Sequence, residues 1–163
     1  MLEPPLPGYN FLVTLDPGDA YLPPAQAALV RLVAAGAFQE VKGLGADLEV
    51  TSYPEGGVND YIHQLPVRHS WSRLSLRRGI VRDISLWLWY QAGLSGSLGA
   101  RRDGCVILLT GGGVPAISWI FKAGLAAKWQ GPELNAQQGA VAMEGLEIAH
   151  QGLRQIPLSP SGT

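Results

Sequence analysis

The sequence predicts one α+β domain that is mainly β. Apolar and polar residues alternate along several short runs, which is the pattern of half-buried strands. The 21 glycines and 12 prolines stand between these runs rather than in a low-complexity tract, as is typical of strands joined by turns. A chain of 163 residues is long enough for one hydrophobic core and leaves no room for a second domain.

The first predicted elements are a short strand and a helix. Tyr9–Leu15 is an apolar run typical of a strand, and residues 16–19 (DPGD) close it as a turn. Residues 24–35 predict a helix, because Pro24 suits a first helical turn and the following residues are good helix formers. Gly36 is expected to end this helix.

The segment from Gly36 to Gly79 predicts a long β-hairpin with one polar and one apolar face. Because strand side chains alternate between faces, the two arms separate into two sets. The polar set is Asp47, Glu49, Thr51, Arg73, Ser75 and Arg77, and the apolar set is Leu48, Val50, Leu74 and Leu76. Antiparallel pairing is expected to bring Arg73 and Arg77 near Asp47 and Glu49. Prolines and glycines between the arms predict that residues 54–70 form a long loop.

The second half of the chain predicts one more helix and several strands. Asp83 can cap a helix over the sequence ISLWLWYQAG, which is apolar nearly all round and therefore expected to need cover from a neighbouring subunit. Residues 104–122 predict a hairpin with its turn at residues 111–113, and residues 125–130 and 140–150 predict two further strands. Residues 155–163 are expected to form a flexible tail, which leaves six or seven strands and one or two helices in all.

Composition excludes several classes of function. The net charge of −1 and the charged fraction of 15% give no basic footprint for nucleic acid. The single cysteine, Cys105, has no partner in the sequence for a disulfide and is expected to be a small buried side chain. The N-terminus lacks the pattern of a secretory signal, and no segment is apolar enough to span a membrane, so no membrane binding and a cytoplasmic site of synthesis are expected.

No constellation for catalysis, metal binding or cofactor binding is recognised. His63 and His69, with Glu55 and Asp60 nearby, match no known ligand spacing. The three glycines at 111–113 are not followed by the Lys-Ser/Thr pair of a phosphate-binding loop. Five tryptophans leave one other class open, a β-rich ligand- or carbohydrate-binding module that stacks its ligand on aromatic rings.

From Gly36 to Leu153 the chain resembles the tail tube proteins of contractile phage tails and extracellular contractile injection systems. The resemblance is carried, in order, by GAFQEVKGL, YPEGGVNDYIHQLP, LSLRRG with the Trp-rich helix, ARRDGCVILL, KWQGPELNA and AVAMEGLEIAHQGL. It implies two packed antiparallel β-sheets, as a barrel or sandwich, with one flanking helix. It further implies a hexameric ring whose hairpins close a barrel around a lumen, and rings that stack into a tube inside a sheath.

The resemblance also implies roles for individual residues. The lumen-lining set would be Asp47, Glu49, Thr51, Arg73, Ser75 and Arg77. The set at subunit and ring interfaces would be Tyr53, Glu55, Asn59, Asp60, Tyr61, His63, His69, Trp87 and Trp89. The implied partners are further copies of the chain, stacked rings, sheath and baseplate proteins and a protein cargo, with assembly in the cytoplasm and a place in a particle that is released from the cell.

The chain departs from the family pattern before Gly36. Family members have a short connection there, whereas this sequence inserts residues 17–35, predicted to carry the extra N-terminal helix of a single domain over 1–154. Such an addition suits a specialised ring, so a tube initiator at the baseplate is the alternative to a repeated tube subunit. Residues 124–127 (GLAA) stand where the family has an aromatic-Pro step, which leaves the path of that strand open.

Overall fold

The computed structural model describes residues 4–15, 38–95 and 100–158. The expected turn at 16–19, the helix at 24–35 and the inserted segment 17–35 lie outside these residues. The described strands are β1 (Phe11–Leu15), β2 (Phe38–Lys42), β3 (Ala46–Tyr53), β4 (His63–Trp71), β5 (Leu74–Gly79), β6 (Arg102–Leu109), β7 (Pro115–Gln130), β8 (Met143–Ala149) and β9 (Gly152–Pro157), and the described helix is α2 (Ser85–Leu94). The prediction of a mainly β chain with antiparallel strands is confirmed.

One continuous path of strands builds the body of the molecule. Its order is β1-β6-β7-β8-β5-β2, with β9 added beside β7, and every pairing is antiparallel. The first half of β7 pairs with β6 and β9, and its second half pairs with β8. We call the strands around the first half sheet A (β1, β6, β7, β9) and those around the second half sheet B (β2, β5, β8, β7). The path stays open, so the described strands of one protomer form no closed barrel.

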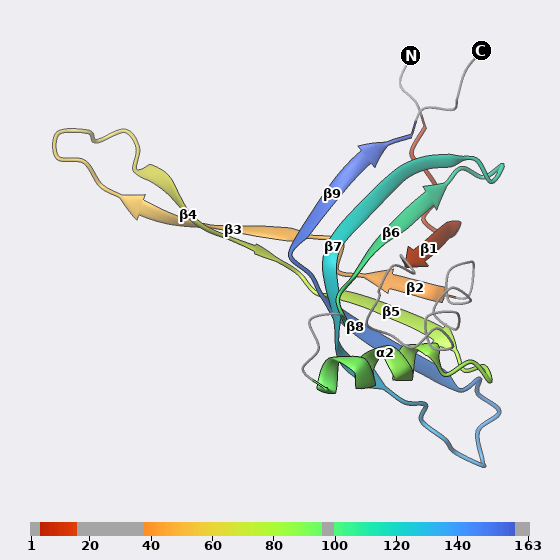
Figure 1. Ribbon diagram of the computed structural model, residues 1–163. Coiled ribbons are helices and arrows are strands. Elements are labelled where there is room, and N and C mark those ends of the chain that lie inside the picture. Colours follow the sequence, from red (N-terminus) through yellow and green to blue (C-terminus); the bar gives the residue numbers. More distant parts are fainter. Residues whose placement is uncertain (1–3, 16–37, 96–99, 159–163) are drawn as a thin grey trace.

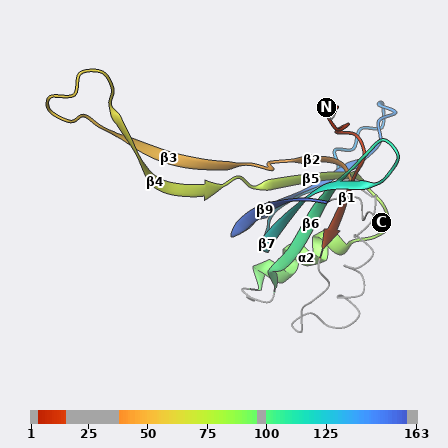
Figure 2. The same cartoon turned by 90° about the horizontal axis from the view of Figure 1, so that it is seen from above.

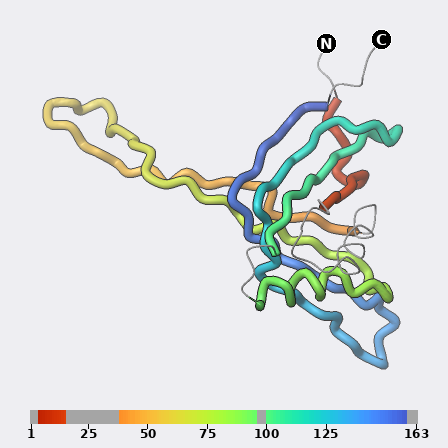
Figure 3. Tube along the Cα trace, viewed as in Figure 1, coloured from red at the N-terminus to blue at the C-terminus, as the bar shows by residue number. Residues whose placement is uncertain are grey.

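Strand β7 bends from one sheet into the other, as the tube in Figure 3 shows. At the bend Ala123 has a positive φ of 50°, and its N–H donates to Asp103 Oδ1 at 2.8 Å. The residue that follows is Gly124, where an added Cβ would lie 2.7 Å from the Phe121 ring. The expected separate strands before and after residue 124 are therefore halves of one 16-residue strand.

The core lies between the two sheets and the helix. Leu74 and Leu76 on β5, like Leu146 and Ile148 on β8, point inward with the period of two that the sequence shows. Helix α2 packs along this assembly, visible in Figure 1, and buries Leu86 and Trp89. The rest of the cluster is Val13, Leu15, Phe38, Val106, Phe121 and Ala126.

Helix α2 begins at Ser85, one residue later than predicted, and Ile84 rather than Asp83 is its N-cap residue. Asp83 Oδ1 accepts the Ser85 N–H at 2.9 Å, which satisfies one of the free donors of the first turn. Trp89 Nε1 donates to the Ala100 carbonyl at 2.7 Å. One side of the helix stays open in the protomer, since Leu94 is 67% exposed. No helix within the described residues is long and apolar enough to cross a membrane.

The C-terminal segment is ordered further than expected. Residues 155–157 belong to β9, where Gln155 pairs with Trp119 and Pro157 with Ile117. The expected tail from residue 155 is therefore wrong for these three positions, because β7 offers them a free edge for backbone hydrogen bonds. Residues 159–163 lie outside the described part.

A buried arginine ties sheet B to the helix. Arg78 on β5 is 1% exposed, and its Nε donates to Glu144 Oε1 on β8 at 2.6 Å. Its other nitrogens reach Asp83, at 3.2 Å to Oδ2 and 3.1 Å to the carbonyl. Glu144 Oε2 accepts in turn from Trp129 Nε1 on β7 at 3.3 Å. Three strands and the start of the helix thus share one polar cluster within the apolar body.

Removing the arginine should unfold the body readily. The variant Arg78→Met leaves Glu144 as a buried charge without its partner, and we expect it to lower the free energy of unfolding by about 3–5 kcal/mol. The exposed pair of Lys122 and Asp103 supplies a matched control, since Lys122→Met should cost about 1 kcal/mol or less. Urea unfolding of both variants at one protein concentration measures the difference, and equal losses would contradict the role given to Arg78.

Candidate functional site

Strands β3 and β4 form an arm that projects from the body, as Figures 1 and 2 show from two directions. They pair only with each other, as a separate two-stranded sheet from Ala46↔Trp71 to Tyr53↔His63. All residues of β3 are exposed. The expected loop over 54–70 is wrong for residues 63–70, because they continue the hairpin as β4, and only residues 54–62 connect the two strands.

The register defines the faces of the arm. Asp47 lies opposite Ser70 and Glu49 opposite Arg68, whereas Thr51 lies opposite Leu65. Leu48 lies opposite His69, and a register shift follows between Glu49 and Val50. The strand expected here is present, but all its residues are exposed, and the predicted pairing with Arg73 and Arg77 is wrong. Those arginines belong to the body, beyond the point where the arm begins.

Large apolar side chains of the arm face solvent in the protomer. Leu48 is 52% exposed, Val50 51%, Leu65 46% and Val67 59%. The tip adds Tyr53, Tyr61 and Ile62, all exposed. This many exposed large apolar side chains on one hairpin are typical of a contact surface.

The tip is held by polar and aromatic contacts. His63 Nε2 lies 2.8 Å from Glu55 Oε2, and the Tyr61 ring stands edge-on to His63 at 5.1 Å between centroids. Ser52 and Gln64 bond across the strands at 3.1 Å. Asn59 and Asp60 are exposed in the connection. These contacts fix the hairpin end without a metal, and the described residues contain no group of three or more His, Cys, Asp or Glu that could hold one.

The two histidines considered together in the sequence lie far apart on the arm. His69 stands near the base and packs on Trp71 with 4.3 Å between ring centroids. At the base itself, His150 joins the arm to the β8–β9 corner: Nε2 lies 3.0 Å from the Ser72 carbonyl and Nδ1 3.1 Å from the Gly152 carbonyl. His150 is thus a hydrogen-bonded structural residue, as its position in the sequence indicates.

The chain turns from β2 into the arm at a glycine that no other residue can replace without strain. Gly43 has a φ of 88°, and a Cβ there would lie 1.9 Å from the Arg73 carbonyl oxygen. The segments that enter and leave the arm therefore pass close to each other at this point. This corner sets the direction in which the arm leaves sheet B.

The outward face of sheet B carries the remaining polar residues of the predicted lumen set. We call it the charged face; its residues are Glu40, Lys42, Arg73, Ser75, Arg77, Lys128, Gln130, Gly145 and Glu147. The cross-strand register places them in two rows, Lys128-Glu147-Ser75-Lys42 and Gln130-Gly145-Arg77-Glu40. Sequence reasoning missed the members from β2, β7 and β8, because no local pattern tells which distant strands lie beside β5.

Two carboxylates organise the cations of this face. Glu40 contacts Lys42 Nζ at 2.5 Å and Arg77 Nη1 at 3.7 Å. Glu147 contacts Arg73 at 3.5 Å and Lys128 at 3.6 Å. The hydrogen bond from Lys42, together with the charges of Lys42 and Arg77, lowers the pKa of Glu40 below its ordinary value. Glu40 therefore keeps its ion pairs at neutral pH.

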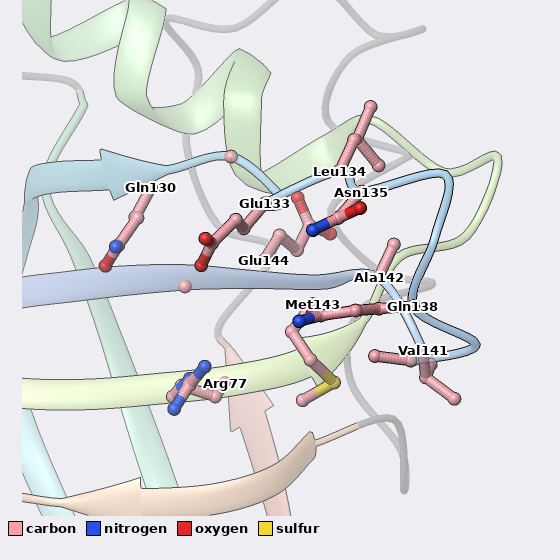
Figure 4. Close-up of a pocket in the computed structure, with 13 residues that line it drawn as sticks. Arg77, Gln130, Glu133, Leu134, Asn135, Gln138, Val141, Ala142, Met143 and Glu144 are labelled. Carbon is pink, nitrogen blue, oxygen red and sulfur yellow. The ribbon is translucent and has the colours of Figure 1, made fainter.

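A polar cavity of about 290 Å³ adjoins the charged face under the loop between β7 and β8. Figure 4 shows residues of this loop, β5, β7 and β8 around it, among them Arg77, Gln130, Glu133 and Gln138. Its lining contains no serine, threonine, cysteine, lysine or histidine, and its carboxylates are Glu133 and Glu144.

The tryptophans form contacts within the body. Trp89 is 1% exposed and lies in the core, so its expected place at a subunit interface is wrong. Trp87 packs on Trp129 with 4.8 Å between ring centroids, and Trp119 Nε1 donates to Gln155 at 3.1 Å. None of the five is among the exposed large hydrophobic residues, and four of them are partly buried. Burial raises the pKa of the Cys105 thiol, in keeping with an unreactive side chain.

Solved structures with this fold come from contractile injection systems. A chain of the anti-feeding prophage baseplate superposes with a TM-score of 0.78 at 26% identity, covering 95% of this chain and 97% of that one. A chain of the anti-feeding prophage tube-terminating cap gives 0.78 at 18% identity, with 97% and 95% covered. A chain of the sheath–tube complex of an extracellular contractile injection system, PVC, gives 0.74 at 17% identity, with 96% and 95% covered.

The sequence itself identifies the family. No curated protein matches the chain. Residues 7–154 match the family described as T4-like virus tail tube protein gp19, which spans nearly all the described strands. The chain therefore belongs to the T4-like tail tube protein family, whose fold it shares with components of contractile injection systems.

Proposed function

We propose that this chain is a structural, ring-forming component of the inner tube of a contractile injection system or phage-tail-like particle. The observation that carries the proposal is the arm: a projecting two-stranded sheet with exposed apolar side chains, on a body of the tail tube family. A two-stranded hairpin is marginally stable alone in water. The arm therefore requires a partner surface, and stacked rings of the same chain supply one.

The open edges of sheet B explain how a ring closes. Among the described strands, β2 pairs only with β5, and the second half of β7 pairs only with β8. Edge-to-edge contact between successive copies satisfies the free backbone groups of both strands. Six copies then close a hexamer, and closure removes every exposed edge of the four-stranded sheets.

In such a ring the charged face lines the bore. Arg73, Ser75 and Arg77 belong to the wall itself, and Asp47, Glu49 and Thr51 continue the polar surface onto the arm. The apolar core and helix α2 lie on the other side of sheet B, away from the bore. The interface set is the arm with the open side of the helix: Tyr53, Glu55, Asn59, Asp60, Tyr61, His63, His69 and Trp87.

The proposed mechanism is geometric and needs no cofactor or catalysis. Contraction of a sheath drives the tube, and this chain provides a hollow rod through which cargo passes. The solved neighbours include a baseplate and a sheath–tube complex, which supports sheath and baseplate proteins as partners. Assembly then takes place in the cytoplasm, before the particle leaves the cell.

Ring formation can be tested by mass. We expect particles of six times the 17.4 kDa chain mass in mass photometry, with hollow rings in negative-stain images. In the proposed assembly the side chains of Leu48 and Val50 are buried against a neighbouring copy, and each contributes about 1.5–3 kcal/mol. The double variant Leu48→Asp/Val50→Asp places charges there, so the concentration of rings or of ring stacks should fall at least tenfold.

The matched control for the arm is Val114→Asp. Val114 is 47% exposed but lies at the turn between β6 and β7, outside the arm and sheet B. Rings of this variant should form as in the wild type. Monomers of the wild type at high concentration would refute the ring, and equal losses in both variants would refute the role of the arm.

A second candidate is the tube initiator, a specialised ring at the baseplate. It is favoured by the higher identity to the chain from the anti-feeding prophage baseplate, 26% against 17% for the chain from the sheath–tube complex. A ring at the baseplate has different neighbours above and below, whereas a repeated subunit must present complementary ends.

Position along the particle axis separates the two candidates. A small tag at the C-terminus, imaged in native particles, should label one layer next to the baseplate if the chain is an initiator. Labelling at every layer would establish a repeated tube subunit instead. Deletion of residues 17–35 should then abolish tube nucleation but not ring closure in an initiator.

A further inference from the structure

The charged face has an excess of positive charge that the chain as a whole lacks. Four cations (Lys42, Arg73, Arg77 and Lys128) lie there with two carboxylates, Glu40 and Glu147, which leaves 4 − 2 = +2. The whole chain carries −1. Each carboxylate already contacts two cations, so neither cluster is neutral. The face can therefore take up further negative charge.

A hollow lies between the two clusters. Gly145 stands in the middle of its row, between Gln130 on β7 and Arg77 on β5, and contributes no side chain. The depression above it is lined by Ser75, Arg77, Lys128, Gln130, Gly145, Leu146 and Glu147. Two partly exposed cations, a hydroxyl, a carboxamide and the Glu147 carboxylate, which pairs with Lys128, thus surround a hollow of about 30 Å³.

We propose that the charged face binds an acidic polypeptide segment, with a carboxylate seated over Gly145 between Arg77 and Lys128. This inference rests on the proposed function, because the acidic segment is taken to belong to a protein that is carried through the bore or anchored in it. Arg77 supplies a planar pair of N–H donors suited to a carboxylate. Ser75 and Gln130 add neutral donors beside it.

The mixed charges of the face favour a polypeptide over nucleic acid. A nucleic-acid backbone brings negative charges at close, regular spacing and is bound by uninterrupted cations. Here Glu147 lies between the two lysines of one row, Glu40 lies beside the single cation of the other, and Glu133 lines the adjoining cavity. No residue of the charged face is aromatic, so bases find no surface to stack on.

The test uses the full-length protein and three fluorescent probes: a short polyglutamate peptide, a polylysine peptide of equal length and a single-stranded oligonucleotide. Fluorescence anisotropy at low salt should show binding of polyglutamate alone. The variant Arg77→Gln/Lys128→Gln should weaken that binding about tenfold or more, since two charge-assisted contacts are lost. Gly145→Ala should also weaken it, because the added Cβ fills the hollow while lying 3.7 Å or more from its neighbours.

The matched control is Lys122→Gln. Lys122 is an exposed lysine of β7 with its own carboxylate partner, Asp103, but it belongs to sheet A. Its loss should leave polyglutamate binding unchanged. Absence of polyglutamate binding, or an equal loss in the control, would overturn the inference, and tighter binding of the oligonucleotide through the same residues would overturn the class of partner. The mass of the same samples reports ring formation separately, so failure of binding in intact rings contradicts only this inference.

Discussion

The buried ion pair between Arg78 and Glu144 is the constraint on which the rest of sheet B depends. Burial removes both charges from water, and only the direct contact of 2.6 Å with its added bonds to Asp83 and Trp129 compensates for this cost. The pair also fixes the register of β5 on β8, because Arg78 lies opposite Glu144. A slip of one residue would turn every side chain to the other face. The inner pair therefore determines that Arg77 and Gly145 face outward.

Local patterns were enough to predict the parts of the fold that depend on neighbours in sequence. The strand at β3, the inward leucines of β5 and a helix soon after Asp83 all follow from residues a few positions apart. The charged face could not be predicted in this way. Arg73 meets Glu147 rather than Asp47, since the corner at Gly43 redirects the chain between β2 and β3 and leaves β8 as the neighbour of β5. Such partners depend on the topology of the whole sheet.

Two predicted interruptions of strands are wrong, and the structure gives a physical reason for each. Pro66 indicated a loop, yet it lies within β4, opposite Val50. A proline is tolerated there because each strand of a two-stranded sheet has a free edge, where the missing N–H removes no ladder bond. Separate strands were expected up to residue 122 and from residue 125, yet β7 continues through this region. The carboxylate of Asp103 accepts the Ala123 N–H at the bend and so replaces the bond that the sheet loses there.

The arm and the charged face are joined directly through the chain. Strand β2 leads into β3, and β4 leads into β5, so both strands of the arm continue strands of sheet B. His150 joins this junction to the β8–β9 corner through the carbonyls of Ser72 and Gly152. Any partner that seats the exposed leucine and valine side chains of the arm therefore also orients sheet B. In a stacked ring, the same contact that covers the arm would align the charged face with the axis of the bore, which couples assembly to the chemistry of the channel.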